Sequence, residues 1–272
     1  YLMGSPFVAT TLAAQALITS GSEAQKNQWL SEIASGAAAS VGLTEEDRNW
    51  RLQEIAATAT ANGETLSLAG TKCFVLDAKQ AQAIVVSVMF EGAARLVLIQ
   101  ADQIPSGALM REVVIDETRR SFTFKLDGIS VPRSQLLEGA DFAALEQAAM
   151  LMLVAEMSGG LAGVLHVIID YLTTRKQFDQ YIGSYQSLKH PTVQILLSME
   201  ACRSHLYHAA TVMAAGDTAA AEEAVRMAKA QGSEAFAFAG DRAVQFHGGF
   251  GFTYECDAQL YFCLLYTSDA AD

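Results

Sequence analysis

A glycine-rich segment near the end of the chain has the residue types and spacing of an anion-binding loop. Residues 245–255 read QFHGGFGFTYE, with three glycines within four positions and a carboxylate at the close. Glycine adopts positive φ readily and lets a ligand approach the backbone, and successive exposed N–H groups can hold a phosphate or pyrophosphate. A glycine-rich turn that simply ends a helix is the alternative. Gln245, Gly248 and Gly249 are therefore candidate contacts; His247 is a weaker one, because a lone histidine is more often structural.

A second group of candidates lies upstream, where Arg175 closes a long apolar helical stretch. A planar guanidinium can fork two hydrogen bonds onto paired phosphate oxygens. The alternative is a solvated arginine at a helix C-terminus, favoured there by the helix dipole. Phe178 and Gln186 follow shortly after, and their order relative to the glycine-rich segment favours a shared ligand.

Composition limits the classes of function. A net charge of −12 makes nucleic acid and anionic membranes unexpected partners, since both need clustered cations. No uninterrupted apolar run approaches the roughly 18 residues of a spanning helix, and the first residues carry no signal-peptide pattern. The four cysteines lie far apart without CxxC spacing, so we expect no metal site, no disulfide and a reducing, cytoplasmic environment.

The apolar periodicity divides the chain into three parts that must position these residues. Residues 6–35 have a helical pattern, with Ser22 and Gln25 as a capping box at the start of a second helix. From residue 41 to about 131 the pattern alternates, as in the strands of a small barrel or sandwich. The predicted strands there are 65–70, 72–76, 83–88, 95–99 and 121–126. Beyond residue 136 the chain is helical again.

Three long helices are predicted in this last part, over residues 140–177, 184–215 and 218–246. Asp217 can cap the third helix, and Glu222 and Arg226 can pair at i,i+4. Long helices with short connections imply a bundle.

With these motifs in order, the chain resembles the acyl-CoA dehydrogenase family over nearly its whole length. The resemblance is carried by GSEAQKNQWLSEIASG, LSLAGTKCFV, RKQF, Gln186 and QFHGGFG. It implies an α+β fold: the end of an α-helical N-terminal domain (1–40), a middle β-barrel or sandwich domain (41–135) and a C-terminal four-helix-bundle domain (136–262). It also implies that the chain is truncated at its N-terminus and that residues 263–272 are a non-native tail.

The resemblance implies FAD as cofactor. Arg175 would reach the FAD phosphates in a neighbouring subunit, with Phe178 packed nearby. Gln245, Gly248 and Gly249 would contact the same pyrophosphate. The remaining implied contacts are Gln186 on the adenine side, and Thr44 and Phe74 at the flavin ring.

The implied reaction is α,β-dehydrogenation of an acyl-CoA, which needs a base for the α-proton and a hydride acceptor, flavin N5. In the family the base is a glutamate, either in a late Tyr-Glu-Gly-Thr segment that is missing here or early in the first bundle helix. Counting back from Phe178 puts Ala149 at the second place. Glu156, about two turns further on the same face, is the candidate, because apolar and small neighbours would desolvate it. Glu146 and Glu255 are weaker candidates, and a solvent-facing or paired glutamate is the alternative.

Several departures from the family pattern leave other functions open. Glu46 stands where the family has proline after Thr-Glu. Beside an enzyme that passes electrons to an electron-transfer flavoprotein, as a homo-dimer or tetramer, we therefore consider a catalytically degenerate subunit of a hetero-oligomer. Flavin-dependent oxygenation is a third hypothesis. Gly159, Gly160 and Gly163 either widen an acyl pocket or allow close helix packing.

Overall fold

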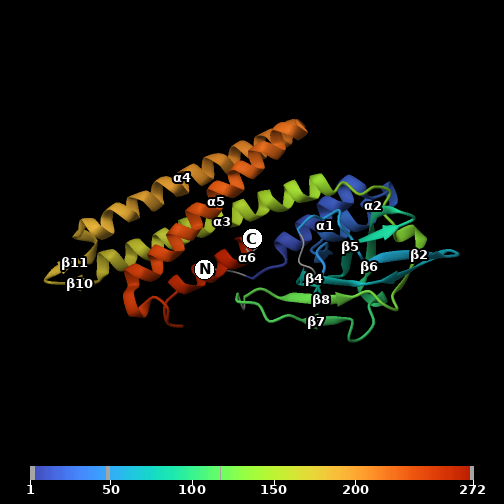
Figure 1. Cartoon of the computed structure of the whole chain (residues 1–272), viewed down its shortest axis with the longest axis horizontal. Helices are drawn as coiled ribbons and strands as arrows, with labels where there is room; N and C mark the ends of the chain where they lie inside the picture. The colour runs from blue at the N-terminus through green and yellow to red at the C-terminus, as the bar shows by residue number, and fades with distance from the viewer. Residues whose placement is uncertain (1–3, 47–49, 117, 270–272) are drawn as a thin grey trace. The chain divides into compact units, whose positions relative to one another are not determined.

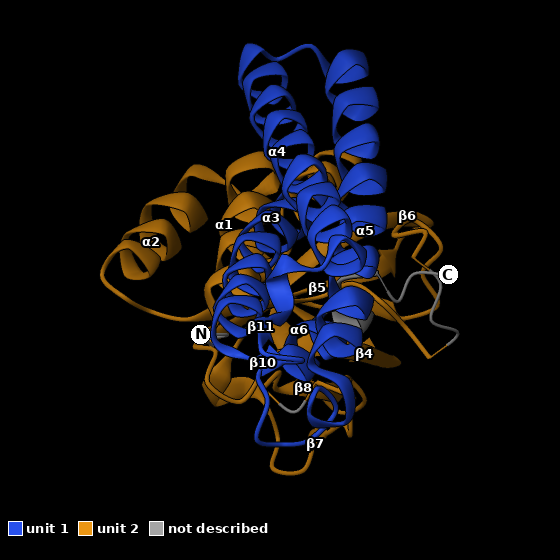
Figure 2. Cartoon of the chain, turned by 90° about the vertical axis from the view of Figure 1, so that its left-hand side faces the viewer, with its two compact units in different colours: residues 1–3, 150–272 blue, residues 4–149 orange. Residues whose placement is uncertain are grey.

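The structure, a computed structural model, describes residues 4–46, 50–116 and 118–269, with side chains described through residue 264 (Figure 1). The chain divides into two compact units, one of residues 4–149 and one from residue 150 onward (Figure 2). The fold is mixed α+β, as predicted. The three-part domain boundaries stay a prediction.

Two helices open the first unit, α1 (Phe7–Ser20) and α2 (Glu23–Ala34). The predicted capping box of α2 is present: the Gln25 amide donates to Ser22 Oγ, and the Ser22 amide donates to Gln25 Oε1. The Gln25 side chain also donates to the carbonyl oxygen of Ser134 at 2.9 Å. A helix-capping residue thus fastens α2 to the segment that follows the last strand of the unit.

Two sheets share one core in the first unit, which gives the predicted sandwich. The larger has the order β1-β5-β2-β3-β9 with β6 paired to β5, and the smaller has the order β4-β8-β7. Leu66 and Val86 from the larger sheet and Phe122 and Phe124 from the smaller are buried in the same cluster. The strands of the larger sheet are β1 (Ala39–Gly42), β2 (Thr58–Asn62), β3 (Thr65–Ala69), β5 (Ala83–Phe90), β6 (Ala93–Gln100) and β9 (Ser130–Pro132). Those of the smaller are β4 (Thr71–Leu76), β7 (Leu109–Arg111) and β8 (Ser121–Lys125).

Helix α3 (Phe142–Thr174) enters the second unit at Met150 and provides its central apolar stripe. Its side chains at i, i+3 and i+4 spacing are buried in the bundle core: Val154, Met157, Leu161, Val164 and Ile168. The other helices are α4 (Gln186–Ala215), α5 (Thr218–His247) and α6 (Ala258–Asp269).

Two predicted features of α5 are confirmed. Asp217 caps it by accepting from the Ala220 amide at 3.1 Å, and Arg226 pairs with Glu222 at 3.1 Å. Helix α4 ends at Gly216, whose φ of 80° stops the helix.

Helix α3 is apolar over a greater length than we expect from the lack of a long uninterrupted apolar run in the sequence. An 18-residue window in it has a mean hydropathy of 1.8, so among the described residues this helix is long and apolar enough to cross a membrane by length and composition. Buried core helices pass the same test, and the core stripe of α3 packs in the bundle.

Two α3 glycines serve close helix packing. A Cβ on Gly160 would come within 2.8 Å of the Phe236 ring in α5, and one on Gly163 within 2.6 Å of the Tyr261 hydroxyl in α6. Gly159 faces open space. Of the two hypotheses for these glycines, the structure supports packing for Gly160 and Gly163.

Helix α6 was missing from the predicted elements. It runs through Asp269, so most of the segment set apart in the sequence as a foreign tail is helical, and Leu264 is buried in the bundle core. The fold therefore includes residues that the sequence pattern excluded, while their non-native origin stays a prediction.

Candidate functional site

The glycine bend, defined here as residues 248–251, begins where α5 ends at His247. Gly248 has φ 61° and ψ −142°, a conformation that a residue with a side chain rarely adopts. It opens the short 3-10 turn η4 (Gly248–Phe250). Gly248 and Gly249 are exposed, and a Cβ on either would meet nothing within 4 Å. The backbone here is open to a ligand, as the sequence predicts.

His247 is held as a structural residue. Its side chain is buried and its Nδ1 lies 2.7 Å from the carbonyl oxygen of Ala243. Because a carbonyl only accepts, Nδ1 carries the proton. The imidazole stacks on Tyr171 of α3 with ring centroids 4.2 Å apart. This contact ties the end of α5 to the end of α3.

Arg175 lies at the same end of the bundle as the glycine bend. The Arg175 amide donates to the carbonyl oxygen of Tyr171 at 2.9 Å, so Arg175 lies one helical turn after Tyr171. The Tyr171 ring is the one that stacks on His247. Arg175 is exposed, and so are Gln245 in the last turn of α5 and Gln186 at the start of α4. The structure thus brings an exposed cation and an open backbone bend to one end of the bundle within a single chain.

A hairpin that the sequence did not predict follows Arg175. The predicted helix continues to residue 177, which is wrong: α3 ends at Thr174, and β10 (Lys176–Gln177) pairs with β11 (Gln180–Tyr181). Phe178 and Asp179 form the two-residue turn with φ of 52° and 61°. Such turns normally have Asn, Asp or Gly at the first of the two positions and Gly at the second, so Phe-Asp gave no recognisable turn signal. Phe178 is 87% exposed at the tip.

In the first unit, Thr44 and Phe74 lie beside each other in the fold. Thr44 and Cys73 form an antiparallel bridge: the Cys73 amide donates to the Thr44 carbonyl at 2.9 Å, and Thr44 Oγ1 donates to the Cys73 carbonyl at 2.6 Å. Phe74 is the next residue, on a bulge of β4, with φ 55°. Strained backbone and bulges are features that recur beside functional sites. The two predicted flavin-ring contacts are therefore neighbours.

Trp50 is a further aromatic residue of this region that the sequence pattern did not single out. Its ring stacks near the Phe74 ring, with centroids 6.5 Å apart and planes 15° from parallel. It lies in the connection between β1 and β2, where a lone tryptophan has no periodic pattern to indicate its contacts.

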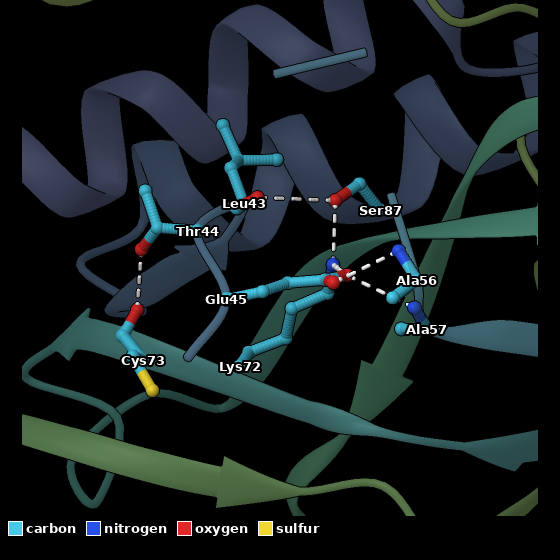
Figure 3. A network of polar contacts seen from close by, with 8 residues as sticks. All are labelled: Leu43, Thr44, Glu45, Ala56, Ala57, Lys72, Cys73 and Ser87. Atoms are coloured by element: carbon cyan, nitrogen blue, oxygen red, sulfur yellow. Dashed lines mark hydrogen bonds and ion pairs between the residues drawn. The ribbon is translucent and has the colours of Figure 1, made fainter. Parts of the chain in front are cut away.

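The same unit contains a buried ion pair that was also not predicted. The Lys72 side chain is 0% exposed, and its Nζ lies 2.6 Å from Glu45 Oε1 and 2.9 Å from Ser87 Oγ (Figure 3). Glu45 also accepts from the amides of Ala56 and Ala57 at 2.8 and 3.0 Å. The only sequence signal was a lysine inside an otherwise apolar strand.

Hydrogen bonding decides the ionisation of Glu45. Partial burial raises its pKa, but the hydrogen bonds from Lys72 and the two amides outweigh this and lower the pKa below its ordinary value. Glu45 is therefore a carboxylate at neutral pH.

The three candidate bases are not gathered at one place by any contact described. Glu156 is half-buried on α3, beside buried Val154 and Met157, and is less enclosed than expected. Glu146 is half-buried on the part of α3 that belongs to the first unit, and Glu255 is exposed after the glycine bend. Their roles stay predictions. Among the described residues no group of three His, Cys, Asp or Glu could hold a metal ion, and the four cysteines are thiols.

Comparisons with known proteins bear on the whole chain. Residues 144–263 match the family described as "Acyl-CoA dehydrogenase, C-terminal domain". The chain is 32% identical over 248 residues to acyl-CoA dehydrogenase fadE12 of Mycobacterium tuberculosis (strain CDC 1551 / Oshkosh), covering 86% of this chain and 64% of that protein. The chain thus spans somewhat less than two thirds of that relative.

Solved structures agree on the fold. The ChsE4-ChsE5 complex from Mycobacterium tuberculosis matches with a TM-score of 0.86 and 25% identity, covering 98% of this chain and 72% of that one. Butyryl-CoA dehydrogenase from Megasphaera elsdenii matches with a TM-score of 0.86 at 20% identity, covering 96% and 71%. At that identity the second match shows the fold alone.

Proposed function

We propose that the chain is an FAD-binding subunit of the acyl-CoA dehydrogenase family that dehydrogenates an acyl-CoA thioester between its α- and β-carbons. The observation that carries this proposal is the arrangement at one end of the bundle. Exposed Arg175 lies one turn from Tyr171, which stacks on His247 beside the open glycine bend. A cation and free backbone N–H groups together suit a diphosphate.

The described residues fit FAD in two places. At the bundle end, Arg175 would donate to the diphosphate together with the backbone of Gly248 and Gly249, where no Cβ obstructs approach. The exposed side-chain amide of Gln245 would contact the same diphosphate, and that of Gln186 would bind toward the adenine side. In the family these groups serve the cofactor of a neighbouring protomer, so the proposal includes an oligomer.

In the sandwich unit, Thr44 and Phe74 would contact the flavin ring. The Thr44 hydroxyl already donates to the Cys73 carbonyl, so it would meet the ring as an acceptor. Phe74, half-buried on its bulge, would offer an apolar face. When bound, FAD supplies the hydride acceptor at its N5 atom.

Glu156 is the proposed base for the α-proton. It is the half-buried carboxyl within the bundle part of α3, and its neighbours are apolar or small. We further propose that electrons leave to an electron-transfer flavoprotein and that the protein works in a reducing, cytoplasmic compartment, where its four cysteine thiols would stay reduced.

A second candidate is a catalytically degenerate subunit of a hetero-oligomer. Ala149 stands at the family's early base position, and Glu46 replaces the proline after Thr44 and Glu45. The ChsE4-ChsE5 neighbour is itself a complex of two different chains. These features favour a subunit that contributes to a cofactor site while another supplies the base.

Anaerobic titration with acyl-CoAs of several lengths tests the proposal. The purified chain should bind FAD, and a substrate should bleach the flavin absorbance. Glu156→Gln should keep FAD but slow the bleaching by about 100-fold or more, the usual contribution of a general base. Glu223→Gln, which alters an exposed carboxyl on α5, is the matched control.

Three outcomes separate the hypotheses. A folded chain that binds no FAD contradicts the proposed function. FAD bound without bleaching by any acyl-CoA supports the degenerate subunit. Bleaching that survives Glu156→Gln removes that residue as the base.

A further inference from the structure

We infer that the buried Lys72/Glu45 ion pair is a positioning device that holds the backbone of residues 43–45 in the conformation that receives the flavin ring. The inference rests on the proposed function. It concerns residues that hold the backbone on which one of the predicted ring contacts, Thr44, is carried.

Each of the three residues is fastened separately (Figure 3). Lys72 reaches Glu45 directly at 2.6 Å and also donates to Ser87 Oγ, which in turn donates to the Leu43 carbonyl at 3.4 Å. Thr44, between them, is bridged to Cys73 by two hydrogen bonds. One ammonium group therefore restrains the residues on both sides of Thr44.

Glu45 extends the restraint to the next connection. Its two oxygens accept from the amides of Ala56 and Ala57, where the chain returns to the sheet at β2. These hydrogen bonds join the two ends of the connection that carries Trp50, whose ring stacks near Phe74. The same carboxylate thus joins the residue after Thr44 to the residues that lead into β2.

A buried ion pair is a poor way to gain stability, since well-packed apolar side chains of similar volume commonly hold a fold as well. A charged pair instead constrains the orientation of the groups that it joins. The ammonium and carboxylate have fixed hydrogen-bond geometry, with Lys72 fully buried, so they define the backbone of residues 43–45 more narrowly than apolar packing does. That argues for a role in the site rather than only in the core.

The test compares the full chain with Lys72→Met/Glu45→Gln, which removes both charges while the new carboxamide oxygen can still accept from a backbone amide. The melting temperature should stay close to the parent value. Amides of Ala56, Ala57 and Cys73 should exchange hydrogen about tenfold faster, while those of β5 stay protected. FAD should bind about tenfold more weakly, as expected for loss of a restrained contact. Lys125→Met, which alters an exposed lysine on β8, is the control and should change none of these.

The outcomes are distinguishable. A parent chain that binds no FAD contradicts the proposed function itself. If the parent binds FAD and the folded double variant binds it equally well, the positioning role is overturned, whatever the exchange rates. A double variant that unfolds also overturns it, because the pair would then serve the fold.

Discussion

At the scale of single residues, the ionisation of Glu45 makes the stability of the sandwich unit depend on pH. Its folded-state pKa lies below the ordinary value of 4.5, because Lys72 and two amides favour the carboxylate over the cost of burial. A group with a lowered folded-state pKa contributes stability above its unfolded-state pKa, and that contribution is lost as pH falls through the folded-state pKa.

The pH dependence of unfolding tests this linkage. Urea unfolding from about pH 7 down to about pH 3 should show a steeper loss of stability in the parent than in Lys72→Met/Glu45→Gln, with the difference appearing below pH 4.5. Glu223→Gln should keep the parent's slope. Identical slopes for parent and double variant would mean that Glu45 does not titrate differently in the two states.

Gly248 is a second residue whose contribution to stability is set by its backbone conformation. At φ 61° and ψ −142°, Gly248→Ala should lower the free energy of unfolding by about 1–3 kcal/mol through strain. Gly249→Ala, which meets open space without positive φ, should cost less than about 1 kcal/mol. Chemical denaturation of both variants checks this, and equal costs would show that the bend adapts to a side chain.

At the scale of elements, glycines in α3 let the bundle helices approach. Gly160→Ala should destabilise the chain by about 1–3 kcal/mol, because its Cβ would lie 2.8 Å from the Phe236 ring. Gly159→Ala, one residue away and facing open space, should stabilise it by up to about 1 kcal/mol through helix propensity. Thermal unfolding of the pair is the measurement, and a Gly160→Ala variant as stable as the parent contradicts the packing role.

The elements that could be predicted were those with local signals. Ser22 and Gln25 predicted the start of α2, and Asp217 predicted the start of α5, because caps act within a few positions. Alternating residues predicted β3, β4, β5, β6 and β8 but missed the other strands of the two sheets: β1, β2, β7 and β9. The β10/β11 hairpin was missed because its turn begins with Phe178, which does not signal positive φ, and Asp179 stands where such turns usually have glycine.

The parts of the site that escaped prediction depend on distant pairing. Lys72 and Glu45 meet only because β4 lies beside the segment after β1, and no periodicity specifies that meeting. Trp50 finds Phe74 in the same way. Thr44 and Phe74 are named from the family resemblance, and Arg175 and the glycine bend also from their residue types; their roles stay predictions. The pairing that puts Thr44 beside Cys73, and so next to Phe74, has no signal in the sequence.

At the scale of the whole molecule, the α+β class and its sandwich and bundle followed from where the period of apolar residues changes. The role of the assembly is a proposal. In the proposal, each chain would contribute a diphosphate-binding end of its bundle and a ring-binding surface of its sandwich, and the family resemblance implies cofactors shared between protomers.

The most direct test of the central claim is the FAD affinity of Arg175→Ala, measured by flavin fluorescence. Loss of a charge-assisted contact to the diphosphate should weaken binding by about tenfold or more. Arg203→Ala, which alters an exposed arginine on α4 paired with Glu200, should bind as the parent does. If Arg175→Ala binds FAD as tightly as the parent, Arg175 and the glycine bend do not form the diphosphate site, and the account is contradicted.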